Sequence, residues 1–446
     1  MISEKLKRVH FIGIGGIGVS ALTRYFLSQG AKVSGSDLAE SEIINELRKE
    51  GMSIVIGHSD RNLMPGTELV IYSPAVRGNN PEIIAARELG IPIQSYPVAL
   101  GELTRKYYTI AVSGSHGKST TTALISLILV EAGLDPTVII GTKLKEFGPS
   151  TGSGYTTGSN FRIGKSKYLV IEADEWDKSF LHYRPQVIVL TNIDKEHLDT
   201  YKNFRGVVHG FKKYAEKLPE GGYFVANFGD KNIRRIARSV RKRGVTVVFY
   251  NRGKFRKHPL QIPGGHNQLN AEAAWQCAKI FGINKAVANK TFKSYQGAWR
   301  RLEQLPTSNL PPLTSVYSDY AHHPTEIKAT LSALRERHKK AKLICVFQPH
   351  QQDRLTRLFQ DFIYAFDEAD KVVILPIYKV AGREEEKGKD SFALAQKIRE
   401  HKESTFYAPD LENALKVIKQ ELTDGGVVVF MSAGDLDSQV RQFLLG

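Results

Sequence analysis

The sequence predicts an α/β protein of three doubly wound domains, and three observations lead to this fold class. Strand-like apolar runs alternate with helix-like runs along nearly the whole chain of 446 residues, as in parallel sheets covered by helices. Two glycine-rich loops each follow a strand-like run and precede a helix-like one. The length suits two to three domains. We expect the domains at 1–106, 107–303 and 304–446.

In the first region, apolar runs of strand length alternate with a run that has the 3.6-residue spacing of a helix. The predicted elements are strands at Val9–Ile14, around Lys32–Ser34, at Glu68–Tyr72 and at Ile91–Gln94, and a helix at Val19–Gln29. The tripeptide Ser34-Gly35-Ser36 is expected to separate the second strand from Asp37.

The second region opens with a buried strand and a long helix, and a Gly/Ser/Thr-rich stretch predicts a loop, because such residues favour turns. The predicted elements are strands at Tyr108–Val112, Tyr168–Ile171 and Val187–Leu190, a helix ending at Glu131, a loop at Ser150–Asn160 and a helix at Gly264–Phe281.

The last region follows Leu305–Thr314, whose adjacent prolines suggest a linker or domain edge. Strands and helices then alternate again, which predicts another doubly wound unit. The predicted elements are strands at Val316–Ser318, Leu343–Phe347, Lys371–Leu375 and Gly426–Met431, and helices at Pro324–Arg337, Leu355–Phe366, Phe392–His401 and Leu411–Leu422.

The composition excludes several classes of protein. With 41% hydrophobic and 24% charged residues, the chain has globular composition, and no apolar run approaches the roughly 20 residues of a membrane-spanning helix. The only two cysteines, Cys277 and Cys345, exclude a disulfide framework and favour a reducing cytoplasm. Met1–His10 leads straight into a strand, so a secretory signal is not expected.

The charge is strongly basic, since 62 Lys and Arg residues against 46 Asp and Glu residues give +16. Such an excess is typical of proteins that bind nucleic acid, nucleotides or phosphates. The densest basic run, Lys231–Arg243, alternates apolar and basic residues at helical spacing. A solvated helix face is the simpler interpretation, and contact with nucleic acid is the alternative.

The first glycine-rich loop is Gly13-Ile-Gly15-Gly16-Ile17-Gly18. Its glycines permit a tight turn and let backbone N–H groups approach a pyrophosphate at the start of a helix. Asp37 lies about where an acidic residue contacts a ribose. NAD and UDP-sugars both satisfy this geometry, and a purely structural turn could use the same glycines, so the motif alone leaves its ligand open.

The second loop, Gly114-Ser115-His116-Gly117-Lys118-Ser119-Thr120, resembles a shortened phosphate-binding loop, because Val112 occupies the position of the first Walker glycine. Its N–H groups can form an anion nest, Lys118 can neutralise β/γ-phosphate charge, and the Ser119 hydroxyl can ligate Mg²⁺. Its place between a strand and a helix favours a nucleoside triphosphate over a structural glycine turn.

Acidic residues follow two further strands. Glu172, Asp174 and Glu175 come at the end of one strand, and Asp194, His197 and Asp199 come after the next. The carboxyl ends of parallel strands meet at one edge of a sheet, where carboxylates beside a phosphate loop suit a magnesium site. Exposed acids in a solvated loop are the alternative, and His197 alone could equally start a helix or lie in the core.

Three polar groups stand out in the last third. Asn267 and Asn270 share one helix face, which can read a base edge or cap the helix. Arg300 and Arg301 form a basic pair, which could be functional or merely a surface feature. The segment Asp319-Tyr320-Ala-His322-His323-Pro324 lies at a strand end before a helix, the position that ligands prefer in doubly wound sheets.

In this order, the motifs resemble the Mur ligase superfamily over essentially the whole chain. The matching segments are GIGGIG with SGSD at Asp37, GSHGKSTTT, EADEWDKSF, TNIDKEHLDTY, GGHNQLNAEAA, WRRLE, DYAHHPTE and FQPH at His350. The resemblance implies an N-terminal Rossmann-like UDP-binding domain, a central phosphate-loop ATPase-like domain and a C-terminal Rossmann-like domain. It also implies an amide ligase that uses ATP and Mg²⁺: ATP phosphorylates the lactyl carboxylate of UDP-N-acetylmuramic acid, and an amino-acid amine attacks the acyl phosphate.

The resemblance also implies which residues form the site. Catalysis would use Lys118, Glu172, His197, Arg301 and His322. ATP would contact Gly114, Ser115, His116, Gly117, Lys118, Ser119, Thr120, Asn267, Asn270, Arg301 and Asp319. The UDP-substrate would contact Gly15, Gly16, Ile17, Gly18, Asp37, Ser73 and Ser179. The amino acid would contact Tyr320, His322 and Arg354, and the metal would bind Ser119, Glu172 and His197.

The segment FQPH favours the branch that adds L-alanine over the branch that attaches tripeptides, which typically has an FEPR-like segment there. The sequence then departs from the usual x-x-Ser-Arg-Thr and reads Gln351-Gln352-Asp353-Arg354. Arg354 remains a candidate clamp for the amino-acid carboxylate, but Asp353 adds a negative charge nearby, and Trp176 replaces a common serine. Glycine, L-serine and a peptide therefore stay alternatives to L-alanine.

Two functions of other classes remain as alternatives. An NAD-linked oxidoreductase would use Gly13–Gly18 and Asp37 but leaves the phosphate loop without a role. A nucleic-acid-binding ATPase would explain the charge, but no module that reads RNA or DNA is evident in the sequence. We therefore expect UDP-N-acetylmuramic acid and L-alanine as substrates, no nucleic-acid or membrane partner, a cytoplasmic location, and a monomer or weak homodimer.

Overall fold

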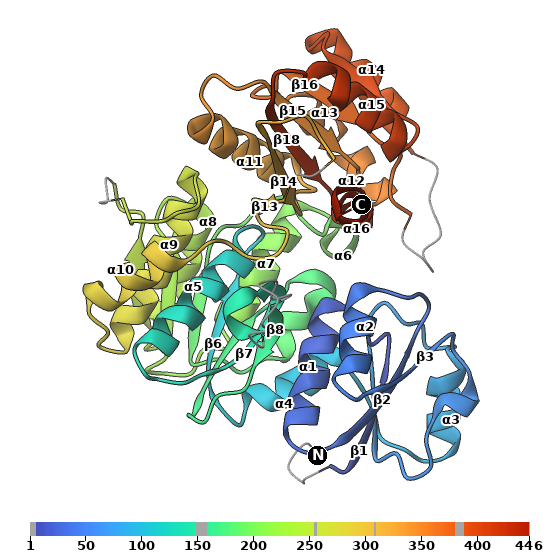
Figure 1. Cartoon of the computed structure of the whole chain (residues 1–446). Helices are drawn as coiled ribbons and strands as arrows, with labels where there is room; N and C mark the ends of the chain where they lie inside the picture. Colours follow the sequence, from blue (N-terminus) through green and yellow to red (C-terminus); the bar gives the residue numbers. More distant parts are fainter. Residues whose placement is uncertain (1–5, 149–157, 254–256, 307–308, 380–387, 446) are drawn as a thin grey trace. The chain divides into compact units, whose positions relative to one another are not determined.

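The computed structural model describes residues 6–148, 158–253, 257–306, 309–379 and 388–445, which form three mostly parallel sheets flanked by helices (Figure 1). The chain divides into two compact units, Met1–Pro259 with Asn270–Lys293, and Leu260–Leu269 with Ser294–Gly446. The first unit carries two sheets and the second carries one. The predicted three-domain α/β architecture is confirmed, while the exact domain boundaries stay a prediction.

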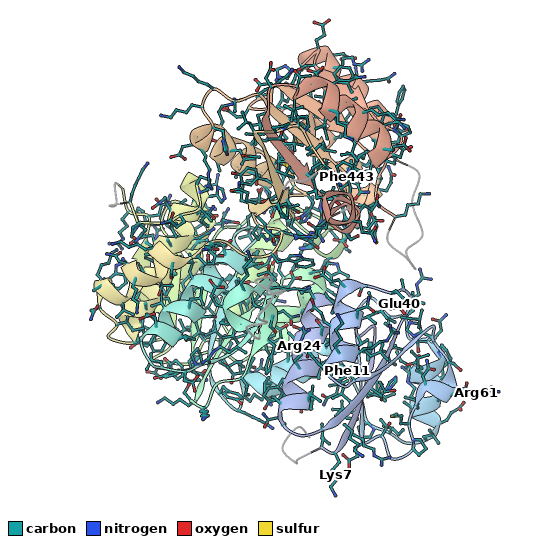
Figure 2. All side chains as sticks on the ribbon, viewed as in Figure 1. Lys7, Phe11, Arg24, Glu40, Arg61 and Phe443 are labelled. Carbon is teal, nitrogen blue, oxygen red and sulfur yellow. The ribbon has the colours of Figure 1, made fainter. Side chains whose placement is uncertain are left out.

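The first sheet is parallel throughout, in the order β3-β2-β1-β4-β5. Its elements are β1 (Arg8–Ile12), α1 (Ile17–Ser28), β2 (Lys32–Asp37), α2 (Glu42–Lys49), β3 (Ser53–Ile56), η1 (Asp60–Asn62), β4 (Leu69–Tyr72), α3 (Pro81–Glu88), β5 (Ile93–Ser95) and α4 (Tyr96–Thr104). In its core, Phe11 of β1, which Figure 2 labels, meets Phe26 of α1 edge to face, with ring centroids 5.9 Å apart. The strand order reverses at β1, so the loop after β1 lies where doubly wound sheets bind ligands.

The second strand corrects the sequence interpretation. Ser34-Gly35-Ser36 does not separate a strand from Asp37, because β2 runs through all three residues and ends at Asp37. Small residues are needed there: a Cβ on Gly35 would lie 2.6 Å from both the Phe11 carbonyl oxygen and Ile14 Cδ1. Close packing under the first glycine-rich loop therefore explains a strand composed of weak strand formers.

The second sheet has the order β12-β11-β10-β6-β9-β7-β8 and is parallel except for the β7–β8 pair. Its strands are β6 (Tyr108–Ser113), β7 (Thr137–Leu144), β8 (Ser159–Arg162), β9 (Tyr168–Glu172), β10 (Val187–Leu190), β11 (Tyr223–Asn227) and β12 (Thr246–Tyr250). Its helices and turns are α5 (Lys118–Glu131), η2 (Lys145–Phe147), η3 (Trp176–His182), α6 (Leu198–Tyr201), α7 (Phe204–Ala215), α8 (Lys231–Arg241), α9 (Gly265–Ile280) and α10 (Lys285–Ser294). The basic run forms α8, which buries Ile233, Ile236 and Val240 and exposes most of its cations.

Two buried cations link the two sheets of the first unit. Lys143 of β7, whose side chain is 1% exposed, lies 2.7 Å from carboxylate oxygens of both Glu42 and Glu46 on α2. Arg24 of α1 (Figure 2) binds Glu50 at 2.7 Å and Asn160 of β8 at 2.5 Å. A buried charge is costly without a partner, so these contacts fix α1 and α2 against β7 and β8.

The sheet of the second unit has the order β13-β14-β18-β15-β16-β17, and only β13 runs antiparallel to its neighbour among the described strands. Its strands are β13 (Glu303–Leu305), β14 (Thr314–Asp319), β15 (Leu343–Phe347), β16 (Lys371–Ile374), β17 (Thr405–Tyr407) and β18 (Gly426–Met431). Its helices are α11 (Pro324–Arg337), α12 (Gln352–Arg357), α13 (Phe359–Ile363), α14 (Ser391–His401), α15 (Leu411–Glu421) and α16 (Leu436–Leu445).

Three sequence expectations change in detail. The segment Leu305–Thr314 connects two paired strands of one sheet rather than two domains. The predicted helix Leu355–Phe366 is two short helices that meet at Leu358. Most of the predicted loop Ser150–Asn160 lies outside the described residues, and its last two residues begin β8.

Two features concern the whole chain. Both cysteines are buried and unpaired, Cys277 in α9 and Cys345 in β15, as expected of inert thiols. Among the residues that the structure describes, no helix combines the length and the apolar character needed to cross a bilayer.

Candidate active site

The first glycine-rich loop is held by the end of the neighbouring strand β2. Gly13 N and Ile14 N both donate to the Ser36 carbonyl oxygen, at 2.8 and 3.1 Å, and Gly15 N donates to Asp37 Oδ2 at 2.8 Å. Gly13 has φ +74°, and a Cβ there would lie 2.8 Å from Ser73 Cβ. Of the predicted UDP-substrate residues, Asp37 and Ser73 therefore lie directly against the loop.

The helix that follows the loop begins without a side-chain cap. Gly16 is the N-cap of α1, and Ile17 and Gly18 form its first turn. The start of such a helix attracts an anion, because its N–H groups point out of the helix and its dipole is positive there. The four remaining predicted residues of this loop thus surround one helix N-terminus at the carboxyl edge of the first sheet.

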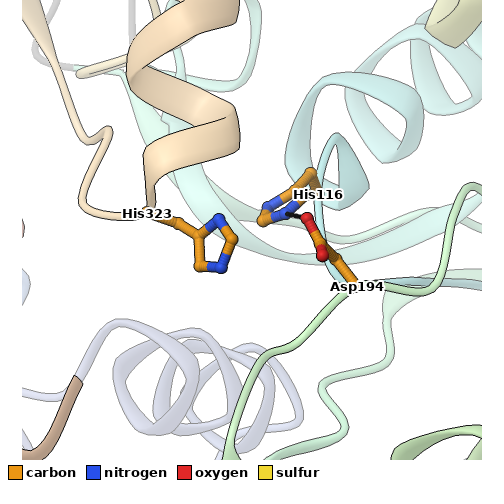
Figure 3. A group of neighbouring side chains, drawn as sticks. All are labelled: His116, Asp194 and His323. Carbon is orange, nitrogen blue, oxygen red and sulfur yellow. Dashed lines mark hydrogen bonds and ion pairs between the residues drawn. The ribbon is translucent and has the colours of Figure 1, made fainter. Parts of the chain in front are cut away.

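The second loop is anchored in the same way by residues that follow β10. Asn192 accepts hydrogen bonds from Ser115 N, at 3.1 Å, and from His116 N, at 2.9 Å. His116 Nε2 lies 3.0 Å from Asp194 Oδ2, the contact drawn in Figure 3. Because these two N–H groups are already bonded, an anion would be bound by the loop from Gly117 onward rather than by the whole predicted nest.

The start of α5 is the part of this loop that is shaped for phosphate. Gly117, with φ +81°, is the N-cap of α5 and carries no side chain that could cap it. The amide of Asn270 lies directly over Gly117, so close that a Cβ there would overlap it. Asn270 thereby reaches the phosphate loop, while Asn267, one turn earlier on α9, donates to the Pro263 carbonyl oxygen at 2.7 Å.

The ammonium of Lys118 is held by a buried carboxylate. Lys118 Nζ lies 2.9 Å from Glu175 Oε2 and 2.8 Å from the Gly114 carbonyl oxygen. The side chain of Glu175 is 0% exposed, and its Oε1 has no hydrogen-bond partner among the described residues. Burial raises the pKa of this carboxyl and the charge of Lys118 opposes that rise, so the two charges depend on each other.

Two groups of potential metal ligands lie at the carboxyl edge of the second sheet. Glu172 Oε1 accepts from Ser119 Oγ at 3.1 Å, and Glu172 Oε2 accepts from Gly141 N at 3.0 Å. Asp174, Glu175 and His197 form the second group, with ligand atoms within 4.8 Å of one another. The structure thus places Glu172 beside Ser119 and groups His197 with Asp174 and Glu175.

The backbone around the second group is strained. His197 has φ +52° at the start of α6, and Asp177, next to the acidic segment, has φ +49°. Non-glycine residues in this region cost free energy and cluster at functional sites.

Tyr96 lies against the first glycine-rich loop, and no motif in the sequence indicated it. A Cβ on Gly18 would lie 2.8 Å from Tyr96 Oη. Burial, together with the negative charges of Glu172 and Asp174, raises the pKa of the Tyr96 hydroxyl. Tyr96 begins α4, which packs against η3 and its buried residue Ser179. Within the first unit, the glycine-rich loop and the acidic cluster are therefore neighbours.

In the second unit, an arginine pair meets the end of β14. Arg300 is buried, and its guanidinium donates to the carbonyl oxygens of Ser432 and, at 2.9 Å, Gly434, so it serves the fold. Arg301 lies over the Tyr320 ring at 5.1 Å. Asp319 accepts from Leu302 N at 2.7 Å and Ala321 N at 2.8 Å, and burial raises its pKa to about 6.

The remaining predicted residues of the second unit lie around His322. Its Nδ1 lies 2.9 Å from the Tyr320 carbonyl oxygen and 3.3 Å from Glu326, and its ring faces that of His350 at 6.3 Å. Arg354, which is 9% exposed, donates to the His350 carbonyl oxygen at 3.3 Å. Asp353 pairs with Arg357 at 2.6 Å, so its negative charge has a partner of its own.

Comparison with known proteins assigns the chain to a family. Three family models match: "Mur ligase family, catalytic domain" at residues 8–108, "Mur ligase middle domain" at 112–262 and "Mur ligase, glutamate ligase domain" at 300–434. A UDP-N-acetylmuramate–L-alanine ligase of Hydrogenobaculum is 39% identical, with 99% of both chains covered. The chain belongs to the Mur ligase family.

Other relatives agree with this assignment. This Mur ligase is 37% identical to the UDP-N-acetylmuramate–L-alanine ligase of Aquifex aeolicus, with 100% of its own chain and 98% of the relative covered. Among solved structures, it matches a UDP-N-acetylmuramate–alanine ligase of Thermotoga maritima with a TM-score of 0.80 and 26% identity, covering 98% of each chain. A murein peptide ligase of Psychrobacter arcticus, at 22% identity and a TM-score of 0.70, shares the fold.

Proposed function

We propose that this Mur ligase joins L-alanine to the lactyl carboxylate of UDP-N-acetylmuramic acid and converts ATP to ADP and phosphate, in the synthesis of peptidoglycan precursors. The observation that carries the proposal is the similarity over the full chain to relatives named UDP-N-acetylmuramate–L-alanine ligase. The packing of Tyr96 against Gly18 of the glycine-rich loop agrees with it. A UDP-sugar on the first loop would extend toward the place where a triphosphate ends. An NAD-linked oxidoreductase would leave this arrangement without a purpose.

The reaction requires two anions to meet, and residues of the first unit would make this possible. The carboxylate oxygen attacks the γ-phosphorus of ATP, the bond to the β-γ bridging oxygen breaks, and ADP leaves. Lys118 would neutralise the transferring phosphoryl group, together with the start of α5. To do so, its ammonium exchanges part of its bond with Glu175 for phosphate oxygens.

Mg²⁺ is part of the proposal because the donors present suit it. Hard divalent cations prefer carboxylate and hydroxyl oxygens, and Glu172 with Ser119 provides both within 3.1 Å. Glu175 Oε1, which has no hydrogen-bond partner in the part of the chain that the structure describes, adds a buried acceptor near Lys118. Ser119 and Glu172 would hold one ion, and His197 with Asp174 a second. When bound, the ions supply positive charge that stabilises the developing charge on the transferring phosphoryl oxygens.

The second unit would bind the amino acid. Arg354 is the proposed clamp for its carboxylate, because a guanidinium offers two parallel donors, and Tyr320 and His322 would contact the rest of the molecule. Arg301, Asp319 and Asn267 are proposed to contact ATP. The amine of L-alanine attacks the acyl carbon, the bond from carbon to the phosphate oxygen breaks, and phosphate leaves. The amine loses a proton as the amide forms.

Several finer properties belong to the same proposal. L-alanine is proposed over glycine, L-serine or a tripeptide because the full-length relatives are named UDP-N-acetylmuramate–L-alanine ligases. The ion pair of Asp353 with Arg357 keeps that negative charge from weakening the Arg354 clamp. We further propose that the enzyme acts in the cytoplasm as a monomer or weak homodimer, without a nucleic-acid or membrane partner.

The proposal is tested by phosphate release from ATP and Mg²⁺. Release is expected only when UDP-N-acetylmuramic acid and L-alanine are both present, and UDP-N-acetylglucosamine, which lacks the lactyl carboxylate, should give none. Oxygen-18 in that carboxylate should appear in the released phosphate, because the acyl phosphate passes an oxygen to it. Phosphate release with glycine, L-serine or a tripeptide in place of L-alanine would mean that the enzyme uses that acceptor instead. Release without the UDP-sugar would overturn the proposed substrate.

A further inference from the structure

A fully buried carboxylate lies beneath the first glycine-rich loop. Glu82, in the first turn of α3, is 0% exposed. Both of its oxygens are surrounded by donors from four different segments of the chain. Oε2 accepts from His10 Nε2 and Ser36 Oγ, both at 2.8 Å, and Oε1 accepts from Asn62 Nδ2 at 2.9 Å, His58 Nδ1 at 3.1 Å and Ser59 N at 3.3 Å.

The donor pattern fits an ionised carboxylate at Glu82. In one tautomer, His10 donates through Nε2 to Glu82 while its Nδ1 accepts from Ser34 Oγ at 2.8 Å. Burial alone would raise the pKa of Glu82, but hydrogen bonds from His10, Ser36 and Asn62 outweigh it and lower that pKa. All five neighbouring groups donate a hydrogen bond to Glu82. An ionised carboxylate, which has only acceptor oxygens, satisfies all of them.

Ser36 connects this carboxylate to the loop above it. Its hydroxyl donates to Glu82, and its carbonyl oxygen accepts from both Gly13 N and Ile14 N. The next residue, Asp37, accepts from Gly15 N. The loop has little room to adjust on its other side, where Ser73 Cβ would be 2.8 Å from a Cβ on Gly13. The position of Ser36 therefore sets the position of the loop.

We infer that Glu82 is a positioning residue for the UDP-substrate site: with His10 and His58 it holds Ser36, and through Ser36 it preorganises the glycine-rich loop and Asp37. This inference rests on the proposed function only in taking a UDP-sugar as the ligand. A buried ionic network is a weak source of stability, because apolar side chains often stabilise a fold as well or better. Its value lies in geometry, since ligand sites need their contacting groups held rigidly.

The test compares Glu82→Gln with Glu88→Gln, which removes the same charge from an exposed position on the same helix. The amide of Glu82→Gln turns an NH₂ group toward at least two groups that donate to the carboxylate, so the hydrogen bonds that hold Ser36 are weakened or rearranged. Binding of UDP and of UDP-N-acetylmuramic acid is measured by calorimetry without ATP. Both dissociation constants should rise at least tenfold in Glu82→Gln and stay within twofold in Glu88→Gln.

Turnover provides the readout that a merely structural role would not give. In Glu82→Gln, the KM for the UDP-sugar should rise at least tenfold, whereas the KM for ATP and kcat at saturation should stay within about twofold. His58→Ala removes one donor to Glu82 at a partly exposed position. It is the substitute variant for this test if Glu82→Gln does not fold. It should raise the same KM about threefold or more.

The outcomes separate this inference from the proposed function. If the unaltered enzyme binds neither UDP compound, the proposed function fails. If it binds them and folded Glu82→Gln binds them equally well, the positioning role is overturned and the proposed function stands. An equal loss of affinity for ATP would show that the whole fold has loosened, and it would also overturn the positioning role. If Glu82→Gln does not fold, an unchanged KM for the UDP-sugar in His58→Ala would overturn it.

Discussion

The ion pair between Lys118 and Glu175 makes a stability prediction that is separate from catalysis. Lys118→Met keeps the length of the side chain but removes the positive charge that lies 2.9 Å from a carboxylate with 0% exposure. Glu175 would then be buried with neither of its oxygens bonded to a cation, because Oε1 already has no hydrogen-bond partner among the described residues. The variant should therefore lose stability as well as phosphoryl transfer.

The expected magnitude follows from the burial of the pair. Removing one partner of a buried ion pair costs about 3–5 kcal/mol, because the other charge is left uncompensated. For a unit of this size, that corresponds to a fall of roughly 10 °C in the unfolding temperature. In the double variant with Glu175→Gln, the uncompensated charge is gone, and at least about 2 kcal/mol should be regained.

Urea unfolding monitored by tryptophan fluorescence measures this effect, since Trp176 follows Glu175 directly. The loss in Lys118→Met should be smaller at pH 5 than at pH 8. Burial raises the pKa of Glu175, so at the lower pH the carboxyl takes up a proton more readily and avoids the buried charge. Lys195→Met, at an exposed position near the same loop, is the matched control and should change stability little.

Two results would refute this reasoning. The first is a loss below about 1 kcal/mol in Lys118→Met, which would mean that Glu175 is solvated in the protein. The second is an equal loss in the double variant, which would mean that Lys118 stabilises the loop by packing alone. Phosphoryl transfer should be absent from both variants, so recovery of stability without recovery of activity distinguishes the two roles of Lys118.

Three further predictions test other parts of the site. Glu172→Gln should raise the Mg²⁺ concentration for half-maximal phosphate release at least tenfold, because the ion would lose its carboxylate ligand beside Ser119 and keep only a neutral amide there. A Mg²⁺ titration checks this. Arg354→Ala should raise the KM for L-alanine strongly and leave the KM for ATP within about twofold in steady-state kinetics. Burial raises the pKa of Asp319 to about 6, so relative to Asp319→Asn the enzyme should lose about 2 kcal/mol of stability as the pH rises from 4 to 7, as thermal melts would show.

Much of the fold could be predicted because its strands are buried on both faces. β10 and α11 have the predicted bounds, Val187–Leu190 and Pro324–Arg337. β10 is a continuous apolar run, and α11 opens with a proline at its first position and His323 as its cap. β3 was missed because it is an edge strand, and three of its four residues are exposed. An exposed edge carries little hydrophobic signal.

The candidate site could be predicted as a set of loops but not as a set of contacts. Local patterns identify glycine loops, acids at strand ends and the Asn267–Asn270 pair, because the chemistry needs those residue types at short spacing. The bond between Lys118 and Glu175 joins residues 57 positions apart, and Tyr96, after β5, lies against Gly18, after β1. Such pairs depend on strand order, which a single sequence does not reveal.

The strand order also explains why a shortened phosphate loop keeps its shape. Val112 lies inside β6 and is fully buried, so the loop begins only at Gly114 and has no first Walker glycine. Asn192, after the neighbouring strand β10, replaces the missing turn by bonding to the N–H groups of Ser115 and His116. Ser36 and Asp37, at the end of β2, support the loop after β1 in the same way. In both sheets the glycine-rich loop is held in place by the end of the adjacent strand, so changes at these anchors should alter ligand affinity without changing a residue of either glycine-rich loop.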